Sequence, residues 1–230
     1  MKTIGLLGGM SWESTMSYYR LINEATKEKL GGLHSAKVCL YSVDFAEIEK
    51  YQHKGEWDKT AKILVKAAQG VEKGGADFVL ICTNTMHLVA PQVQAGINIP
   101  LLHIADATAE EIKKAGIKKI GLFGTAFTME EDFYKGRLEK EHDLEVIIPD
   151  EADRKIIHQV IYDELCLGKI DDISRNEYLR IIDSLVKQGA EGVILGCTEI
   201  ALLVGPKDTA VKLFDTTEIH AIKAVEMALQ

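Results

Sequence analysis

The sequence has no long hydrophobic run and no cluster of basic residues. A membrane-spanning helix needs about 20 consecutive apolar residues. The N-terminal stretch MKTIGLLGGMSWE is interrupted by glycines and Glu13, so we expect no secretory leader there. Nucleic-acid binding relies on clustered Lys and Arg, whereas the net charge here is -8. We therefore expect a cytoplasmic protein that binds neither membranes nor nucleic acid.

The sequence also lacks a CxxC pair, although it has four cysteines, at positions 39, 82, 166 and 197. Zinc needs several ligands at short spacing, and Cys82 with His87 is only half of such a site. We expect free thiols and no metal. Cys39, within an apolar run, and Cys166, on the apolar face of a helix expected at residues 152 to 166, read as small buried hydrophobes.

Short apolar runs alternate with amphipathic segments, which predicts parallel sheets with crossover helices. Strands are expected at TIGLLGG, AKVCLYSV, DFVLIC, KIGLFGT, LEVIIP and VILG, and a helix at residues 57 to 73. Capping-box spacing predicts helix starts at Thr108, Thr128 and Ser174. The last segment, VKLFDTTEIHAIKAVEMAL, adds a strand and a helix without a counterpart elsewhere, and we expect it to pack on the first half.

Two segments occur twice in the same order. KIGLFGT at 119 to 125 is similar to TIGLLGG at 3 to 9, and QGAEGVILGCTE at 188 to 199 is similar to GGADFVLICTN at 74 to 84. The offsets are 116 residues for the first pair and 115 between the two cysteines of the second. This agreement predicts an α/β chain of two duplicated lobes, residues 1–100 plus 215–230 with Cys82, and residues 101–214 with Cys197.

Cys82 and Cys197 each follow a predicted strand and precede a threonine. Ligands of open parallel sheets bind beyond the carboxyl ends of the strands. A helix that begins after each thiol would lower its pKa from about 8.5, because the helix N-terminus stabilises the thiolate. Pro91 would keep the first of these helices short or kinked. Lobes related by approximate two-fold symmetry would let the two thiols face each other across a cleft.

Four segments together resemble the aspartate/glutamate racemase family, in its aspartate-racemase-like branch: GLLGGMSWEST at 5 to 15, CTNTMH at 82 to 87, GCTEI at 196 to 200 and DTTEIHA at 215 to 221. The chain is most similar to the broad-specificity amino acid racemases of that branch. The resemblance implies two pseudo-symmetric Rossmann-like lobes, an interdomain active site, homodimers, and racemisation without pyridoxal phosphate or another cofactor. Racemisation needs one base on each face of Cα, and Cys82 and Cys197 are the expected pair.

The resemblance also implies substrate contacts in the loops that follow the strands. These residues are Met10 and Ser11 in the first turn, and Thr83, Asn84, Thr85 and Thr198 around the α-carboxylate. Tight-turn packing and ordinary helix capping are the structural alternatives.

Four other residues have roles that the sequence leaves open. Glu199 either orients or deprotonates Cys197, or is solvated, or is a charge at a helix N-terminus. His87 is expected mainly as a core or capping residue. Asp215 and His220 match a family motif, with a structural role as good an interpretation.

We infer which substrate side chains are preferred from the absence of cationic residues in two regions of the sequence. Aspartate-specific members of the resembled family bind the distal carboxylate with an Arg after the second strand and a Lys in the second half. Here those regions read SVDFAEIEKYQHKGEW, with Gln52, and YDELCLGK, with Glu164, while Lys54 and Lys169 remain within reach. A buried carboxylate without a cation is costly, so neutral substrates such as homoserine or methionine are expected.

Three alternatives remain. They are an aspartate/glutamate-specific racemase, a decarboxylase or isomerase of the same superfamily that needs one cysteine, and a two-lobed amino-acid-binding protein without turnover.

Overall fold

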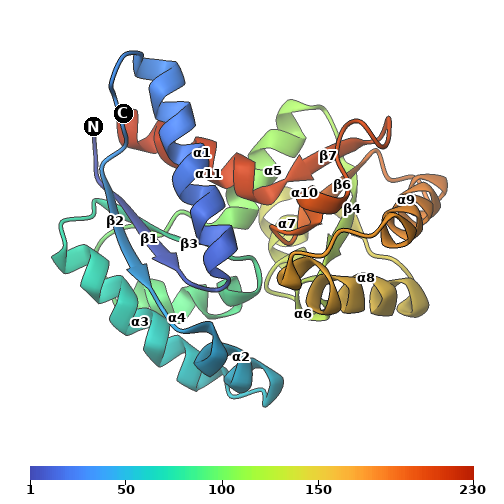
Figure 1. Ribbon diagram of the computed structural model, residues 1–230, viewed down its shortest axis with the longest axis horizontal. Helices are drawn as coiled ribbons and strands as arrows, with labels where there is room; N and C mark the ends of the chain where they lie inside the picture. Colours follow the sequence, from blue (N-terminus) through green and yellow to red (C-terminus); the bar gives the residue numbers. More distant parts are fainter. The chain divides into compact units, whose positions relative to one another are not determined.

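The computed structural model describes residues 1–230 and has a parallel α/β architecture in two compact units (Figure 1). Unit 1 comprises Met1–Ile104 and His220–Gln230, and unit 2 comprises Ala105–Ile219. The predicted fold class, two lobes with parallel sheets, is confirmed. The chain leaves unit 1 after Ile104 and returns at His220, a few residues later than the sequence boundaries after residues 100 and 214.

Unit 1 contains a three-stranded parallel sheet in the order β2-β1-β3. The strands are β1 (Ile4–Gly8), β2 (Val38–Ser42) and β3 (Phe78–Ile81), in a register that sets Ile4 beside both Val38 and Phe78. The helices before the first crossing are α1 (Trp12–Leu30), α2 (Phe45–His53), α3 (Trp57–Lys73), the 3₁₀ helix η1 (Thr85–Val89) and α4 (Ala90–Ala95). The amphipathic pattern at 57 to 73 thus gave the bounds of α3 correctly, whereas α2 was missed.

Alternate residues of the unit 1 strands enter two separate cores. Leu6 and Leu80 pack against α1 and the last helix of the chain, α11 (Thr216–Leu229). Leu7 and Val79 pack on the other side, against α2, α3 and α4. Because both faces of β1 and β3 are covered, these two strands are apolar and buried along their whole length, as central strands of parallel sheets are, whereas the edge strand β2 is partly exposed.

Unit 2 contains a four-stranded parallel sheet in the order β5-β4-β6-β7. Its strands are β4 (Lys119–Gly124), β5 (Glu145–Ile147), β6 (Gly192–Gly196) and β7 (Lys212–Asp215). Its helices are α5 (Ile104–Lys114), α6 (Ala126–Glu130), α7 (Lys135–His142), α8 (Glu151–Asp163), the 3₁₀ helix η2 (Leu165–Leu167), α9 (Asp172–Lys187) and α10 (Ile200–Leu203). Phe123 and Tyr178 pack edge to face, with ring centroids 5.6 Å apart, and fix α9 against the sheet.

The expectation for the final strand was wrong. β7 pairs with β6 of unit 2, with Leu213 beside Val193, and does not join the first half. It also has a counterpart, because Leu101 bridges Val79 at the equivalent edge of the unit 1 sheet. That segment makes a single bridge and does not form a strand, and no strand was predicted there from the sequence. The end of α11 does pack on unit 1, where Ala224 is fully buried.

The three capping-box predictions were also wrong. Thr108 is buried inside α5, which begins four residues earlier. The N-caps of α6 and α9 are Thr125 and Asp171, one turn before the expected residues Thr128 and Ser174. A Ser or Thr three residues before Glu also occurs inside helices, where positions i and i+3 are neighbours, so the spacing alone misplaces the start.

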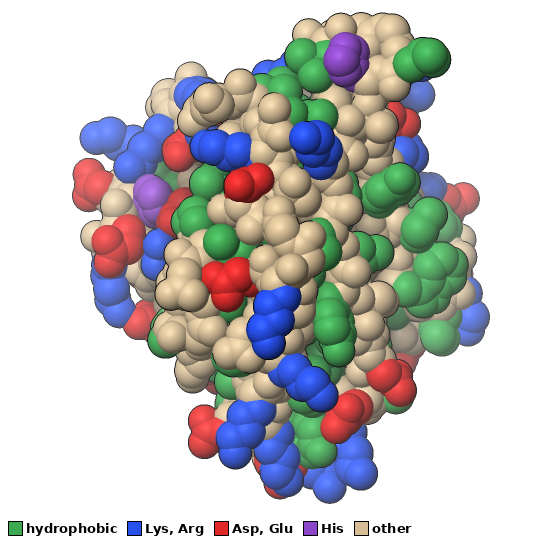
Figure 2. Space-filling model, turned by 90° about the vertical axis from the view of Figure 1, so that its left-hand side faces the viewer, with side chains coloured by type: hydrophobic (Ala, Val, Ile, Leu, Met, Phe, Trp, Pro, Cys, Tyr) green, Lys and Arg blue, Asp and Glu red, His purple; other side chains and the backbone are tan.

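Charges of both signs are interspersed on the face shown in Figure 2, which agrees with the absence of a basic block from the sequence. None of the helices combines the length and the apolar character that crossing a membrane requires.

Candidate active site

The turn after β1 depends on two glycines. A Cβ on Gly8 would lie 2.4 Å from the Thr15 side chain, and one on Gly9, whose φ is +94°, would lie 2.2 Å from the carbonyl oxygen of Val43. Only glycine permits this close approach. The turn leads into α1, where the Ser11 hydroxyl accepts a hydrogen bond from the backbone N–H of Ser14 at 3.3 Å and caps the helix.

Cys82 is held by its backbone at the end of β3. Its N–H donates to the carbonyl oxygen of Leu7 at 3.0 Å, which extends the sheet by one residue. The hydroxyl of Ser14 donates to the Cys82 carbonyl at 2.9 Å, so the first turn of α1 is bonded to the same residue. The side chain is fully buried in the core that contains Tyr18. Ser14 was not among the expected site residues, although it lies within the segment GLLGGMSWEST.

Burial raises the pKa of the Cys82 thiol well above its ordinary value. The expectation of a lowered pKa was therefore wrong. Thr83 and Asn84 separate Cys82 from η1, which is only one turn long, and Pro91 lies in the first turn of α4. A helix terminus is worth about 0.3–1 kcal/mol, less than the roughly 1.4 kcal/mol of one pKa unit, so desolvation dominates here.

Gln52 contacts Met86, which follows Cys82 by four residues. The amide of Gln52, on α2, is buried and donates to the Met86 sulfur at 2.9 Å. Met10 and Met86 belong to one core cluster with Ile48. Unit 1 thus brings together the expected residues of the first turn, Gln52 and the Cys82 loop, and it adds Met86 as a neighbour that sequence reasoning missed.

Cys197 occupies the equivalent strand end of unit 2. It follows Gly196, where a Cβ would lie 2.5 Å from the Phe123 carbonyl oxygen, so glycine is needed for the close approach of β6 to β4. The thiol of Cys197 donates to Oε2 of Glu199 at 2.9 Å, and the Thr198 hydroxyl donates to the same oxygen at 2.6 Å. Glu199 is buried, so the interpretation of Glu199 as a solvated side chain was wrong, whereas it does stand at a helix N-terminus, as the N-cap residue of α10.

The pKa of Cys197 is also raised well above its ordinary value, first by burial and then by the negative charge of Glu199 and its hydrogen bond. Cys166 adds a smaller effect in the same direction, so it lies in the electrostatic neighbourhood of Cys197. Cys166 is in η2, which packs against α10, and not on the apolar face of α8 as expected, because α8 ends at Asp163.

Glu164 lies in the same part of unit 2. Burial raises the pKa of the Tyr178 hydroxyl, and the charges of Cys197, Glu164 and Cys166 raise it further, which places all three near this phenol. Oε2 of Glu164 is buried and has no hydrogen-bond partner.

The remaining motif residues have structural contacts. His87 is buried and its ring bonds to the Thr83 carbonyl at 2.8 Å. Asp215 accepts hydrogen bonds from the N–H groups of Thr217 and Glu218 at the start of α11, although burial raises its pKa. His220 is fully buried.

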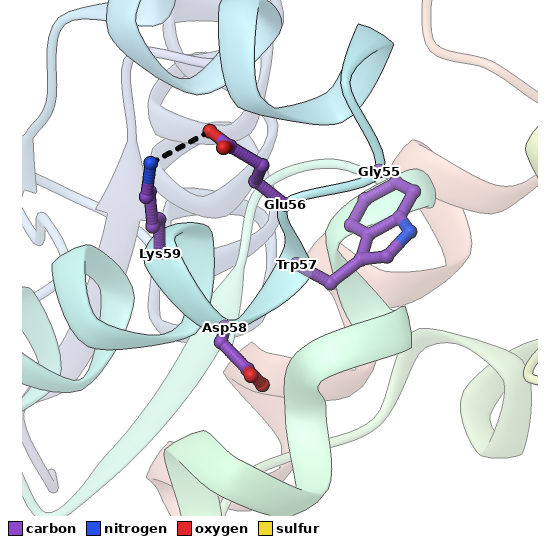
Figure 3. Close-up of a pocket in the computed structure, with 5 residues that line it drawn as sticks. All are labelled: Gly55, Glu56, Trp57, Asp58 and Lys59. Atoms are coloured by element: carbon purple, nitrogen blue, oxygen red, sulfur yellow. Dashed lines mark hydrogen bonds and ion pairs between the residues drawn. The ribbon is translucent and has the colours of Figure 1, made fainter.

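A separate hollow of about 400 Å³ lies at the start of α3 (Figure 3). It is lined by one short segment, residues 55 to 59, in which Lys59 bonds to Glu56 at 2.9 Å and neutralises it. None of the predicted site residues lines this hollow, so we do not assign the site there.

The profile of the family described as Asp/Glu/hydantoin racemase matches residues 7–224, nearly the whole chain. The chain belongs to the Asp/Glu/hydantoin racemase family. It is an enzyme of the isomerase class, a racemase acting on amino acids in a family that works without pyridoxal phosphate. The matched range includes both strand-end cysteines.

Individual relatives agree with this membership. The chain is 24% identical to the broad-specificity amino-acid racemase RacX of Bacillus subtilis, over 98% of each chain. It is 56% identical to a candidate Asp/Glu racemase from Yersinia pestis, with a TM-score of 0.95 and full coverage of both chains. An aspartate racemase homologue from Pyrococcus horikoshii is 38% identical, again over both full chains, with a TM-score of 0.88.

Proposed function

We propose that this racemase inverts Cα of a free amino acid with two cysteine bases, Cys82 and Cys197. The observation that carries the proposal is the 2.9 Å hydrogen bond from the Cys197 thiol to the buried carboxylate of Glu199, at a strand end that matches the position of Cys82 in the other unit. A thiol bonded to a base is the arrangement in which a cysteine is activated for proton transfer.

The proton transfers balance. Glu199 accepts the proton of Cys197, and the Cys197 thiolate then removes the Cα proton from one face of the substrate. The thiol of Cys82 donates its proton to the opposite face, which leaves Cys82 as thiolate and Cys197 as thiol. The opposite enantiomer reacts by the reverse sequence, so both bases are needed in each direction.

The raised pKa values support these roles. A thiol kept protonated by burial is ready to donate, as Cys82 must do for one enantiomer. Once formed in a desolvated site, a thiolate is a stronger base and is better matched to the weakly acidic Cα proton. Burial keeps the Cys197 thiol protonated, so a base must remove its proton before it can act on Cα. The carboxylate of Glu199, to which the thiol is bonded, is that base.

Substrate positioning is assigned to the two strand-end loops. Thr83, Asn84 and Thr85 follow Cys82, so hydroxyl, amide and backbone donors lie next to that thiol in the chain. Thr198 follows Cys197, and because its hydroxyl donates to Glu199, its backbone N–H is the donor that we assign to the substrate. We propose that these donors hold the α-carboxylate and stabilise the charge that develops when the Cα proton leaves. Met10 and Ser11 complete the site from the turn after β1.

We propose a preference for neutral side chains. The buried amide of Gln52 bonds to Met86, which shares an apolar core cluster with Met10, so none of these three residues offers a cation. In unit 2, Glu164 would repel a second carboxylate. The similarity to a racemase named for broad specificity agrees with this proposal. Aspartate/glutamate specificity is the second candidate, because closer relatives carry aspartate or Asp/Glu racemase names.

The experiment that tests the function incubates the enzyme with single L-amino acids in deuterated water, and follows mass and chirality together. Racemisation with one solvent deuteron in each inverted product supports the proposal. Tight binding of an amino acid without inversion would identify a binding protein instead. Loss of CO₂ would identify a decarboxylase.

We also propose a cytoplasmic homodimer, as the family resemblance implies. All four cysteines are unpaired, and thiol chemistry needs a reducing compartment. Sedimentation velocity at micromolar concentration measures the oligomeric state directly.

A further inference from the structure

Unit 1 contains a buried group of three histidines, His87, His103 and His220, which we call the imidazole cluster. The rings of His87 and His103 have centroids 4.5 Å apart, and those of His87 and His220 are 6.0 Å apart. All three side chains are at least nine-tenths buried. Neither the proton transfers nor the substrate contacts proposed above use this cluster, and no group of three His, Cys, Asp or Glu side chains in the chain is arranged to hold a metal ion.

The hydrogen bonds of His87 define its tautomer. Nδ1 lies 2.8 Å from the carbonyl oxygen of Thr83, which can only accept, so Nδ1 carries the proton. The N–H of Ile104 donates to Nε2 at 3.3 Å, so Nε2 is unprotonated and the ring is neutral. His87 therefore connects the residue directly after Cys82 to the first residue of α5. The Ile104 N–H is one of the donors that a helix start leaves without an intrahelical partner.

His220 makes a parallel connection. Its Nε2 donates to the carbonyl oxygen of Leu102 at 2.9 Å, and its Nδ1 accepts from the Tyr18 hydroxyl at 2.8 Å. Two neutral imidazoles thus hold the three-residue segment 102 to 104.

Segment 102 to 104 lies where the chain passes from unit 1 to unit 2. Ile104 is the last residue of unit 1 before the chain crosses into unit 2, and His220 is the first residue after it returns. The cluster therefore bonds the Cys82 loop to both crossings, while every one of these contacts stays within unit 1. A change at His87 alters the connection between the loop that carries one thiol and the helix that leads to the unit that carries the other.

We propose that His87 is a positioning residue for racemisation, which bonds the Cys82 loop to the start of α5 and so fixes where Thr83 and its neighbours lie when the substrate is bound. The inference rests on the two-cysteine function proposed above. A displacement of reacting groups by about 1 Å can cost on the order of 100-fold in rate, so a residue without substrate contact can control kcat strongly.

The test compares His87→Asn with His87→Gln. The Asn amide has the reach to replace Nδ1 and keep the bond to Thr83, but it is too short to reach Ile104 as well. The Gln amide has both a donor and an acceptor further along the side chain, so it can replace the acceptor for Ile104. His34→Gln, at an exposed position, is the matched control. For each variant we would measure kcat and KM, amide hydrogen exchange of Ile104, and the rate of alkylation of Cys82.

We expect His87→Asn to lower kcat by at least about tenfold with KM changed less than about threefold. We also expect it to speed exchange at Ile104 and alkylation of Cys82. His87→Gln should recover most of each loss, and the control should match the parent protein. Equal kcat in the Asn variant and the parent, or unchanged Ile104 exchange in the Asn variant, would overturn the proposal. So would a Gln variant no better than the Asn variant.

Failure of the proposed function would look different. If the parent protein racemised none of the amino acids tried, the two-base function would fail, while exchange at Ile104 and alkylation of Cys82 would still decide whether His87 holds the loop. Cooperative thermal unfolding of each variant shows that the comparison is made on folded protein. If the Asn variant does not fold, a His87→Gln variant with parental kcat and Ile104 exchange upholds the proposal, and one with lost activity but parental exchange overturns it.

Discussion

The thiol of Cys197 donates a hydrogen bond of 2.9 Å to Oε2 of Glu199, whereas Cys82 is fully buried in the hydrophobic core between β3, α1 and α11. The two candidate bases thus occupy matching strand ends in different electrostatic settings. In both, the pKa of the thiol is raised, but only Cys197 has a carboxylate beside it. This asymmetry predicts different consequences for changes at the two sites.

Glu199→Gln should make the Cys197 thiol more acidic and yet slow racemisation. The negative charge of Glu199 contributes to the raised pKa of Cys197, so its removal should lower that pKa and move the alkylation profile of Cys197 to lower pH. Racemisation should nevertheless fall, by about 100-fold or more, because Gln cannot accept the thiol proton as a carboxylate does. Alkylation with mass-spectrometric readout and kcat measurements test both parts. Glu191→Gln, at an exposed position, is the control, and unchanged kcat in Glu199→Gln would refute the role as base.

Cys82→Ser and Cys197→Ser should each abolish racemisation in both directions. A serine hydroxyl is a far weaker acid than a thiol and cannot supply the anion at neutral pH. Each variant is assayed separately for Cα deuterium exchange without inversion, because the remaining cysteine still reaches one face of Cα. Cys39→Ser, inside β2, should keep the parental rate. Normal racemisation by either of the first two variants would exclude the two-base mechanism.

The strand ends and the presence of two α/β lobes were predictable from the sequence because they follow from local patterns. Each cysteine ends a run of buried apolar residues, and a threonine follows each. The direction of the Cys82 pKa shift was not predictable, since it depends on core packing from α1 and α11, which are distant in sequence. The Gln52 contact with Met86 likewise joins residues 34 positions apart.

The predictions of the helix starts and of the place of the last strand were wrong for other physical reasons. Thr125 and Asp171 cap their helices with one side chain each, and the sequence offers a similar residue one turn later. The place of β7 is set by pairing with β6, a tertiary contact that the apolar pattern of the segment does not specify. The hydrogen bond from Cys197 to Glu199 was only partly predictable. The sequence shows that the two residues are two positions apart, but the geometry of the bond depends on the turn after β6.

Stability should fall as the pH rises above the ordinary range of a free thiol. In the unfolded chain Cys82 loses its proton near pH 8.5, but in the folded protein burial raises its pKa, so the thiol stays protonated. The native state then binds more protons, and the free energy of unfolding drops by up to about 1.4 kcal/mol per pH unit for this group. Below that range the thiol is protonated in both states and contributes no slope.

Urea unfolding between pH 7 and 10 measures this dependence. Cys82→Ser removes the titrating group, so its stability should fall less steeply over the alkaline range than that of the parent protein. Cys39→Ser serves as the matched control, because it makes the same substitution at a partly exposed position. Identical slopes for Cys82→Ser and the parent would contradict the role of burial at Cys82.

Selectivity for the substrate side chain should depend on charge at two positions. Gln52 is a buried neutral amide bonded to Met86, and Glu164 presents a buried carboxylate oxygen without a hydrogen bond. Neither stabilises a second carboxylate, whereas a hydroxyl or thioether needs no counter-ion. We expect kcat/KM for homoserine or methionine to exceed that for aspartate and glutamate, with both enantiomers of each assayed. Aspartate ahead by tenfold, about 1.4 kcal/mol of transition-state preference, would show that a cation such as Lys54 or Lys169 reaches the substrate.

Gln52→Arg should then shift the preference towards aspartate by about tenfold relative to methionine, because it places a cation beside the Cys82 loop. Gln159→Arg, which adds the same charge at an exposed position on α8, should leave the ratio unchanged. Glu164→Gln removes the opposing carboxylate without adding bulk, so it should raise the aspartate to methionine ratio even if the larger Arg is not accommodated at position 52. A ratio that stays constant in both Gln52→Arg and Glu164→Gln, in folded protein, would show that neither position faces the substrate side chain.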